Sequence, residues 1–342
     1  MNARVAVIVV NYRTARLVSD CLRSLAGEAA ERIVVVDNAS DDGTADELST
    51  ACAAVGAEFL PLDRNAGFAA GNNAALRRIL ASADQSSRHA PSAVENGTRS
   101  VPTTLPDYLL LLNPDTVVRP GAVAALADFL DAHPKAGIAG SRLENPDGTP
   151  QRSAFRFPSV AGEFENGMRL GVVSKLLAKH VVAPPVRGEA HRCDWVSGAS
   201  LMVRRAVFEQ IGLMDEGFFL YFEEVDFCRR AADAGWQCWY VPTSRVVHFV
   251  SASTGVDAAG PRKRTPTYWF ASRRRYWAKH FYRRDALLAN ALWATGRAGW
   301  QLRRKPAQDP PHLLGDFVRY NLWESWMAAE PDAIQERNLA HE

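Results

Sequence analysis

The chain has 342 residues, 47% of them hydrophobic and 23% charged, and a formal net charge of only +2. These values are ordinary for a soluble globular protein, and the length suits one large domain or two smaller ones. No cysteine pair has the CxxC spacing, which argues against a zinc site and favours a reducing compartment. The N-terminus lacks a signal-peptide pattern and no run of about 18 apolar residues occurs, so we expect a cytoplasmic protein without a spanning helix.

Apolar runs alternate with helical patterns along the first 120 residues. The apolar runs predict strands at Val5–Val10, Ile33–Val36, Ala57–Leu62 and Leu109–Leu112. The patterns between them predict helices at Leu17–Leu25, 42–55 and Phe68–Leu80. Strands that are apolar throughout are typical of a parallel sheet covered by helices on both faces. Residues 82–106 are rich in Ser, Thr and Pro, which predicts a mobile surface insertion.

The second half of the chain becomes patterned again from Asp194. We expect strands at Ser200–Val203, Trp239–Val241 and Val246–His248. We expect helices at Arg205–Ile211 and Glu224–Ala234, and mostly helix from Thr267 onward. The sequence therefore predicts an α/β domain over residues 1–255, with a mostly parallel sheet flanked by helices. A basic, aromatic and helical C-terminal extension follows over residues 256–342.

Polar residues follow each of the first four predicted strands. In chain order they are Asn11 with Tyr12, Asp37 with Asn38, then Asp63, Asn65 and Gly67, and finally Asn113 with Asp115. Each alone is compatible with a simple turn, because Asn and Asp favour turns. Since ligands of open parallel sheets bind at the carboxyl ends of the strands, the four together predict a ligand site at that edge.

The residue types at this edge indicate a nucleotide. Asp37 suits a ribose hydroxyl or a base N–H, and Tyr12 suits stacking on a base. The first strand is not followed by GxGxxG, which disfavours a dinucleotide oxidoreductase or a Walker-type kinase. Asp115 instead suits a divalent cation that bridges phosphate oxygens.

Three carboxylates lie close together in the segment FFLYFEEVDFCRRA. Glu223, Glu224 and Asp226 begin a predicted helix, where acidic residues favour capping and the helix dipole. The aromatic residues around them would also desolvate a carboxylate and raise its pKa, which suits a general base. His248 ends an apolar strand, where it is either structural or a metal ligand beside Asp115.

These segments resemble the family 2 inverting glycosyltransferases of the A-type fold, a nucleotide-diphospho-sugar transferase fold. The resemblance is closest to rhamnosyltransferase-like and galactofuranosyltransferase-like members. It rests on VAVIVVNYRT, IVVVDNASDDGT, NAGFAAGNNAAL, LLLLNPDTVV, WVSGASLMVRR and FLYFEEVDFCRRA with the later His248. These motifs span about 70% of the chain, from Val5 to Phe249, and they are specific in combination.

The resemblance implies a role for each site residue. Glu224 matches the catalytic base, and Asp115 and His248 match metal ligands. The donor site would contain Asn11, Tyr12, Asp37, Asn65, Gly67, Asn72, Asn113 and Asp115, and the acceptor side Trp195, Gly198 and Glu223. The sequence departs from the family where Asn113 replaces the first Asp of the DxD metal motif. It also has a Glu-Glu pair where relatives have Glu-Asp or Asp-Asp, which keeps Glu223 open as the base.

The implied function is a hexosyltransferase that depends on Mg²⁺ or Mn²⁺. It would move rhamnose or another hexose from a UDP or dTDP donor to a glycan or lipid-linked glycan in cell-surface polysaccharide synthesis. One alternative is a nucleotidyltransferase that makes the activated sugar, although VVNYRT offers no glycine-rich phosphate loop. Another is a non-catalytic sugar-nucleotide-binding protein, for which the Asn113 departure leaves room.

The C-terminal extension is strongly basic. From Arg262 to Lys305 it has ten Arg and three Lys against Asp285 alone, a net charge of +12 that leaves −10 for the rest. With its many aromatic residues this segment suits an anionic membrane surface, a nucleic acid or a solvated helical face. Because lipid-linked acceptors lie at the inner membrane face, we favour a peripheral membrane protein and no nucleic-acid partner.

Overall fold

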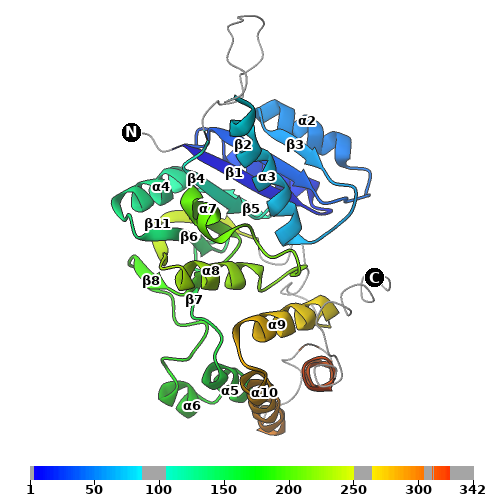
Figure 1. Ribbon diagram of the computed structural model, residues 1–342, viewed down its shortest axis with the longest axis vertical. Helices are drawn as coiled ribbons and strands as arrows, with labels where there is room; N and C mark the ends of the chain where they lie inside the picture. The colour runs from blue at the N-terminus through cyan, green and yellow to red at the C-terminus, as the bar shows by residue number, and fades with distance from the viewer. Residues whose placement is uncertain (1–3, 87–104, 250–263, 304–309, 311, 324–342) are drawn as a thin grey trace, which may run out of the picture.

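The computed structural model describes residues 4–86, 105–249, 264–303, 310 and 312–323, and it shows a central sheet with helices on both faces (Figure 1). The strands are β1 (Val5–Asn11), β2 (Arg32–Asp37), β3 (Glu58–Pro61), β4 (Tyr108–Leu112), β5 (Thr116–Val118), β6 (Ala136–Glu144), β7 (Ala154–Phe155), β8 (His191–Cys193), β9 (Trp195–Val196), β10 (Ser200–Arg204) and β11 (Gln237–His248). The helices are α1 (Ala15–Ser24), α2 (Ala45–Val55), α3 (Phe68–Ser86), α4 (Ala122–Ala132), α5 (Val160–Met168), α6 (Gly171–Leu176), α7 (Arg205–Ile211), α8 (Glu223–Asp233), α9 (Thr267–His280), α10 (Arg283–Arg303) and α11 (Leu313–Phe317), followed by the π-helical turn η2 (Val318–Trp323).

The main sheet has the strand order β3-β2-β1-β4-β10-β6-β11-β5, and β8 pairs with β11. The four strands β1 to β4 are parallel, as the sequence predicts. β10 lies antiparallel between β4 and β6, so the sheet as a whole is mixed. The predicted fold class, a mostly parallel sheet flanked by helices with a helical C-terminal region, is confirmed.

Both faces of the sheet are buried, which explains why its strands are apolar throughout. Because side chains alternate along a strand, β1 sends Val5, Val7 and Val9 to one face and Ala6, Ile8 and Val10 to the other. The first face packs against α1, α2 and α4, and the second against α3, α7 and α8. All the parallel strands therefore end at one edge, where the loops are free to carry the site.

Several predicted boundaries differ from the observed ones. α3 continues to Ser86 and so enters the predicted insertion 82–106, whose residues 87–104 lie outside the described part of the chain. The two short strands predicted around residues 239–248 form the single strand β11, with an irregularity between Val241 and Arg245. Residues 119–193 contain α4, β6, α5 and α6, which the sequence patterns did not predict.

The C-terminal extension is helical, as predicted, and packs closely on the rest of the protein. A Cβ atom on Gly167 of α5 would lie 2.5 Å from the carbonyl oxygen of Trp293 on α10. A Cβ atom on Gly296 of α10 would lie 2.8 Å from the backbone nitrogen of Met168. The stretch of α10 between Asp285 and Arg297, which contains no other charge, thus faces α5, where glycines allow the two backbones to approach.

Basic side chains of α9 point inward to buried or partly buried carboxylates. Arg273, itself buried, lies 3.0 Å from Glu163 on α5. Arg275 lies 2.9 Å from Asp215, in the loop before α8. Part of the charge predicted to form a basic surface is therefore used inside the protein. Within the described residues, no helix is both long enough and apolar enough to cross a membrane.

Candidate active site

The tips of β1 and β2 are joined by a buried hydrogen-bond network. Asn11 donates from Nδ2 to Oδ1 of Asp37 at 2.7 Å and to the hydroxyl of Ser40 at 3.1 Å. Its Oδ1 accepts from the backbone N–H and the hydroxyl of Thr14. All four hydrogen-bonding positions of the Asn11 side chain are thus used within the protein. Asn11 holds Asp37 in place, and Asp37 keeps a free acceptor position on Oδ2.

Tyr12 follows this network and is exposed, with 38% of its surface accessible. The guanidinium of Arg13 lies 5.1 Å from the centroid of the Tyr12 ring and donates to the carbonyl of Ser40 at 2.9 Å. Arg13 has a φ of 56°, in the left-handed region that non-glycine residues rarely adopt. A fixed and strained turn therefore presents the aromatic ring that the sequence assigns to a nucleobase.

The loop after β3 is held against the tip of β2. Asn38 donates from Nδ2 to Oδ1 of Asn65 at 2.8 Å and to the carbonyl of Gly67 at 3.0 Å. Gly67 has a φ of 92°, and a Cβ atom there would lie 2.2 Å from the carbonyl oxygen of Phe219. That same carbonyl accepts a hydrogen bond from the N–H of Phe68. Only glycine fits at position 67, where the donor loop contacts the aromatic segment before α8.

Two predicted donor-site asparagines lie near these loops. Asn72 donates from Nδ2 to the carbonyl of Phe68, while its buried Oδ1 has no hydrogen-bond partner within the described residues. Asn113 follows β4, and its backbone N–H donates to the carbonyl of Ala199 at 3.1 Å. This bond brings the end of β4 beside Gly198, on the predicted acceptor side.

The side chains of Asp115 and His248 meet where β5 begins and β11 ends. The Nε2 atom of His248 lies 3.5 Å from Oδ1 of Asp115, which is buried and accepts no hydrogen bond within the described residues. Gln151 donates from Nε2 to the carbonyl of His248, so its Oε1 accepts from the Nδ1–H of the ring at 3.2 Å. In the neutral ring this arrangement leaves a lone pair on Nε2 that faces the carboxylate. Such a lone pair beside a carboxylate is suited to a shared cation.

No third protein ligand joins this pair: among the residues that the structure describes, no group of three or more His, Cys, Asp or Glu is arranged to hold a metal. Remaining ligands would have to come from a bound phosphate or from water, which is common for Mg²⁺.

The two adjacent glutamates begin α8 directly after a strained turn. Tyr221 and Phe222 have φ angles of 69° and 68°, two consecutive non-glycine residues in the left-handed region. Glu223 is buried and Glu224 partly buried, and each has a buried Oε2 without a hydrogen-bond partner among the described residues. Strained backbone and unpaired buried carboxylates both lower stability, and they occur together mainly at functional sites.

Burial changes the acidity of both groups. It raises the pKa of the Glu224 carboxyl to about 7. Burial, followed by the negative charge of Glu224, raises the pKa of Glu223 well above its usual range. Glu224 therefore titrates near neutral pH, where a general base is most effective, whereas the surroundings of Glu223 favour its neutral form. This difference favours Glu224 over Glu223 as the base.

The predicted acceptor-side residues adjoin Glu224. A Cβ atom on Gly198 would lie 3.6 Å from the ring of Phe68 and 3.9 Å from the Cβ of Glu224, so this position opens onto both. Trp195 belongs to β9, which packs on α8. Its indole N–H donates to the carbonyl of Arg156 at 2.9 Å, which fixes the ring beside the helix that carries Glu224.

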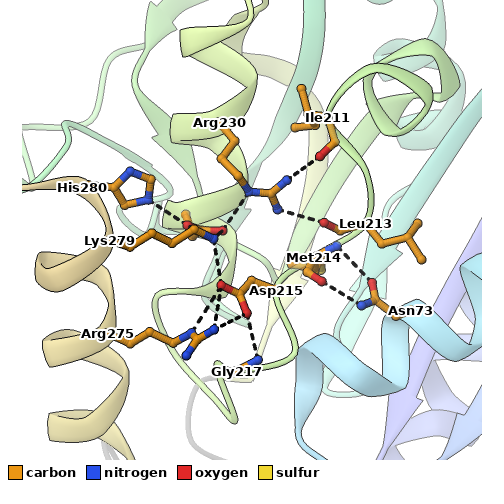
Figure 2. A network of polar contacts seen from close by, with 11 residues as sticks. Asn73, Ile211, Leu213, Met214, Asp215, Gly217, Arg230, Arg275, Lys279 and His280 are labelled. Carbon is orange, nitrogen blue, oxygen red and sulfur yellow. Dashed lines mark hydrogen bonds and ion pairs between the residues drawn. The ribbon is translucent and has the colours of Figure 1, made fainter. Parts of the chain in front are cut away.

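Asp226, the third carboxylate of the segment, has a structural role. It is fully buried and accepts from Nε2 of His280 at 2.7 Å, from Lys279 at 2.9 Å and from Arg230 at 2.9 Å (Figure 2). Burial alone would raise its pKa, but the hydrogen bonds from His280 and Lys279 and the charge of Arg230 lower it overall. Asp226 thus joins α8 to α9 and stays ionised.

The loop before α8 is held from two sides, as Figure 2 shows. Asp215 accepts from Arg275 at 2.9 Å and from Lys279 at 2.7 Å, both on α9. On the other side, Asn73 of α3 exchanges two hydrogen bonds with the backbone of Met214. Despite burial, the contacts with Arg275 and Lys279 lower the pKa of Asp215 to about 2. The C-terminal extension therefore supports the segment that presents the two glutamates.

Sequence patterns did not reveal the residues that orient these groups. Gln151 and the α9 residues contact the site only through the tertiary structure: Gln151 lies 97 positions before His248. Ser40 is local, since it lies just after Asp37 in sequence and hydrogen-bonds with it. Asn38 lies at a strand tip, so the strand-tip rule is sufficient to include it in the site.

Comparison with known proteins agrees with the motifs. A family model described as glycosyltransferase like family 2 matches residues 3–277. An N-acetylglucosaminyl-diphospho-decaprenol L-rhamnosyltransferase of Mycobacterium tuberculosis is 32% identical over 241 residues, 69% of this chain and 72% of that protein. A low-salt glycan biosynthesis hexosyltransferase, Agl10 of Haloferax volcanii, is 27% identical over 226 residues, 66% of this chain and 61% of that protein.

Among solved structures, a mannosyltransferase of Pyrobaculum calidifontis in complex with GDP-Man and Mn²⁺ aligns over 98% of this chain and 79% of that one, with 15% identity and a TM-score of 0.47. The sequence matches alone decide the family, and they confirm the resemblance seen in the motifs and the A-type fold expected from it. The chain belongs to the glycosyltransferase-like family 2.

Proposed function

We propose that this transferase moves a rhamnosyl or other hexosyl group, with inversion, from a UDP- or dTDP-sugar to a hydroxyl of a lipid-linked glycan at an anionic membrane surface. The observation that carries the proposal is Glu224, a partly buried carboxylate whose buried Oε2 has no hydrogen-bond partner among the described residues and whose pKa is about 7, beside Gly198 at the carboxyl edge of the sheet. The rhamnosyltransferase relative supports the choice of sugar and of a lipid-linked acceptor.

The chemistry is a single displacement. Glu224 accepts the proton of the acceptor hydroxyl, whose oxygen forms a bond to the anomeric carbon of the donor sugar. The bond from that carbon to the diphosphate oxygen breaks, and the nucleoside diphosphate leaves with both bonding electrons. One carboxylate is sufficient because the diphosphate leaves without being protonated by an acid, unlike the leaving group of a glycoside hydrolase.

The protein's own groups bind and orient the donor. Asp37, held by Asn11, accepts from the ribose or the base, and Tyr12 stacks on the base. The free Oδ1 of Asn72 is a further acceptor near the loop that contains Gly67. Asn113, Asn65 and Gly67 line the donor side, while Trp195, Gly198 and the protonated Glu223 line the acceptor side.

Asp115 and His248 fit a divalent cation, Mg²⁺ or Mn²⁺. The unpaired, buried Oδ1 of Asp115 and the His248 lone pair fixed by Gln151 are the donor set that a hard or borderline cation prefers. When bound, such a cation would neutralise charge on the diphosphate. Asn113, in place of a second carboxylate, leaves the site with one negative charge fewer than the family's DxD motif.

A donor screen tests the proposal. UDP- and dTDP-sugars are incubated with a lipid-linked or short-chain glycan acceptor, with Mg²⁺, with Mn²⁺ or with a chelator, and release of nucleoside diphosphate is measured. We expect release with one donor class that needs both the acceptor and a cation. Release that is the same with chelator would remove Asp115 and His248 as metal ligands. Formation of a nucleotide sugar from a sugar phosphate would indicate the nucleotidyltransferase alternative instead.

A further inference from the structure

The helices α5, α6 and α10 lie together at one end of the molecule (Figure 1), and several exposed apolar side chains belong to this region. Val172 and Leu176 of α6 are 66% and 80% exposed, and Leu302 near the end of α10 is 90% exposed. Leu170 and Val186 are exposed as well, so one stretch of 17 residues holds four of the exposed large apolar side chains of the described residues. Such a concentration on a protein surface marks a contact with a partner or a membrane.

The same region is basic. Between Arg169 and Gly188 the sequence has four basic residues and no acidic one. Lys175 and Lys179 are exposed, and neither forms an ion pair with a described residue. Arg303 donates to the carbonyl of Met168 at 2.9 Å, which brings the end of α10 beside the start of α6. We call Val172, Lys175, Leu176, Lys179, Leu302 and Arg303 the α6 surface.

The α6 surface combines two features that fit an anionic bilayer. Val172 and Leu176 are four residues apart, so they share one face of α6 and can enter the apolar part of an interface together. Lys175 and Lys179 next to them suit the anionic headgroups. A nucleic acid would use the lysines but would leave the exposed Val and Leu side chains in water, which disfavours that partner.

Hydrogen bonds connect the α6 surface to the acceptor side of the active site. Arg156 donates from Nη1 to the carbonyls of Ala178 and Val181, in the segment that follows α6. Its backbone N–H donates to the carbonyl of Val182, and its own carbonyl accepts from the indole of Trp195. The segment that would touch the membrane is thus hydrogen-bonded to Arg156, which is hydrogen-bonded in turn to Trp195 beside the helix that carries Glu224.

We propose that the α6 surface docks the enzyme on an anionic lipid bilayer, with Trp195 and Glu224 toward the acceptor that the bilayer holds. The orientation of the acceptor rests on the proposed function, whereas binding to lipid does not. The sequence predicts the membrane contact over the whole basic segment 262–305. The inference moves it away from α9, whose Arg273, Arg275 and Lys279 pair with internal carboxylates, to α6 and the end of α10.

Vesicle flotation at physiological salt tests the proposal with the full-length protein. The vesicles are phosphatidylcholine alone or phosphatidylcholine with about one-third phosphatidylglycerol. Two double variants change the α6 surface: Val172→Ser with Leu176→Ser, and Lys175→Gln with Lys179→Gln. A matched control, Arg23→Gln with Lys135→Gln, removes two exposed positive charges elsewhere. All these side chains are exposed, and a thermal unfolding curve verifies that each variant folds.

We expect the wild type to bind the anionic vesicles, each α6 double variant to bind about tenfold more weakly, and the control to change by less than about twofold. A wild type that ignores anionic vesicles, or α6 variants that bind as the wild type does, would overturn the proposal. Sugar transfer to a water-soluble acceptor, measured in parallel, separates the two claims. Transfer without lipid binding removes the α6 surface and the membrane location but leaves the proposed sugar transfer. Lipid binding at α6 without transfer to any acceptor removes the proposed sugar transfer and leaves the α6 surface.

Discussion

At the scale of single residues, Glu224 and Glu223 are neighbours with the same side chain, yet their positions give them different protonation. Neither Oε2 has a hydrogen-bond partner among the described residues. Burial brings the pKa of Glu224 to about 7, while burial and then the charge of Glu224 raise the pKa of Glu223 well above its usual range. When two neighbouring carboxyl groups share a single negative charge, one can act as the base and the other as a neutral hydrogen-bonding group. No further residue is then needed to separate the two roles.

Replacing Glu224 with Gln removes the proton acceptor and keeps the size of the side chain. We expect kcat to fall by roughly 10²- to 10⁴-fold, the usual contribution of a general base, with nucleoside diphosphate affinity nearly unchanged. In the wild type, kcat/KM should fall as the pH drops below about 7, because the carboxylate becomes protonated. Steady-state kinetics and calorimetric binding check both effects, and a wild-type rate in Glu224→Gln would exclude Glu224 as the base.

Glu223→Gln tests the cost of the second carboxyl. Because the folded state raises the pKa of Glu223, it binds the proton more tightly than the unfolded state does, so stability is lost as the pH rises from about 4.5 toward the folded pKa. Glutamine does not titrate. We therefore expect the variant to match the wild type near pH 4 and to be more stable than the wild type at pH 8. Thermal unfolding across pH measures the difference, and equal melting temperatures at pH 8 would contradict it.

Sequence alone identified residues whose position follows from local pattern. Asp37 and Asp115 follow apolar strands, and Glu224 begins a helix after an aromatic run, so strand-tip and helix-start rules are sufficient to find them. The groups that orient them are different: Gln151 fixes the His248 tautomer, and nothing near Gln151 in sequence announces that contact. Such a partner depends on how β11 and the loop after β6 meet in space.

At the scale of elements, the contact between the loop after β3 and the segment before α8 depends on one glycine. Gly67→Ala would place a Cβ atom 2.2 Å from the Phe219 carbonyl at a φ of 92°. Gly43→Ala is a matched control, since Gly43 has a φ of 77° but no atom near its Cβ position. We expect a loss of about 1 kcal/mol for the control and about 3 kcal/mol or more for Gly67→Ala.

Donor affinity and thermal unfolding of the two glycine variants measure this difference. Weaker nucleoside diphosphate binding should accompany the loss of stability only in Gly67→Ala. Equal behaviour of the two variants would show that the backbone conformation, and not the close approach to Phe219, requires glycine at position 67.

The contact between α8 and α9 depends on Asp226. Asp226→Asn leaves Lys279 and Arg230 without their buried counter-charge, and we expect a loss of roughly 3–5 kcal/mol with a lower kcat, because α8 carries Glu224. Asp233→Asn on the same helix removes an exposed partner of Arg229 and should change stability by less than about 1 kcal/mol. Denaturant unfolding and kcat check both, and a stable, fully active Asp226→Asn enzyme would contradict this role.

Glycines explain why the sequence patterns do not predict β6 and α5. β6 contains Gly137 and Gly140, which weaken a strand pattern, yet a Cβ atom on Gly140 would lie 2.5 Å from the Cβ of Val196. Gly140 is needed because β6 and β9 pack closely, and the sequence around Gly140 does not show this contact. α5 was missed for a related reason, since Gly162 and Gly167 interrupt its helical pattern but allow close packing.

At the scale of the whole molecule, the +12 charge of residues 262–305 and the −10 of the rest proved to be partly complementary. The sequence predicts a basic surface because a net charge does not show which way the charged side chains point. In the structure, Arg273, Arg275 and Lys279 of α9 point toward the carboxylates of Glu163, Asp215 and Asp226. Apolar side chains of α9 and α10 also point inward: Tyr276, Trp277 and Ala289 pack against Phe218 and Val225. The extension therefore completes the catalytic domain in place of forming a separate surface.

Truncation tests this interdependence. A chain that ends at residue 263 would leave Glu163, Asp215 and Asp226 without their α9 partners and would expose the apolar cluster around Phe218. We expect it to be recovered aggregated, or to melt at least about 10 °C lower without transferase activity, since each uncompensated buried charge alone costs several kcal/mol. A chain that ends at Trp323 keeps every contact described here and should fold and turn over as the full-length protein does. A stable and active chain 1–263 would instead show that residues 1–255 form an independent domain, as the sequence alone had predicted.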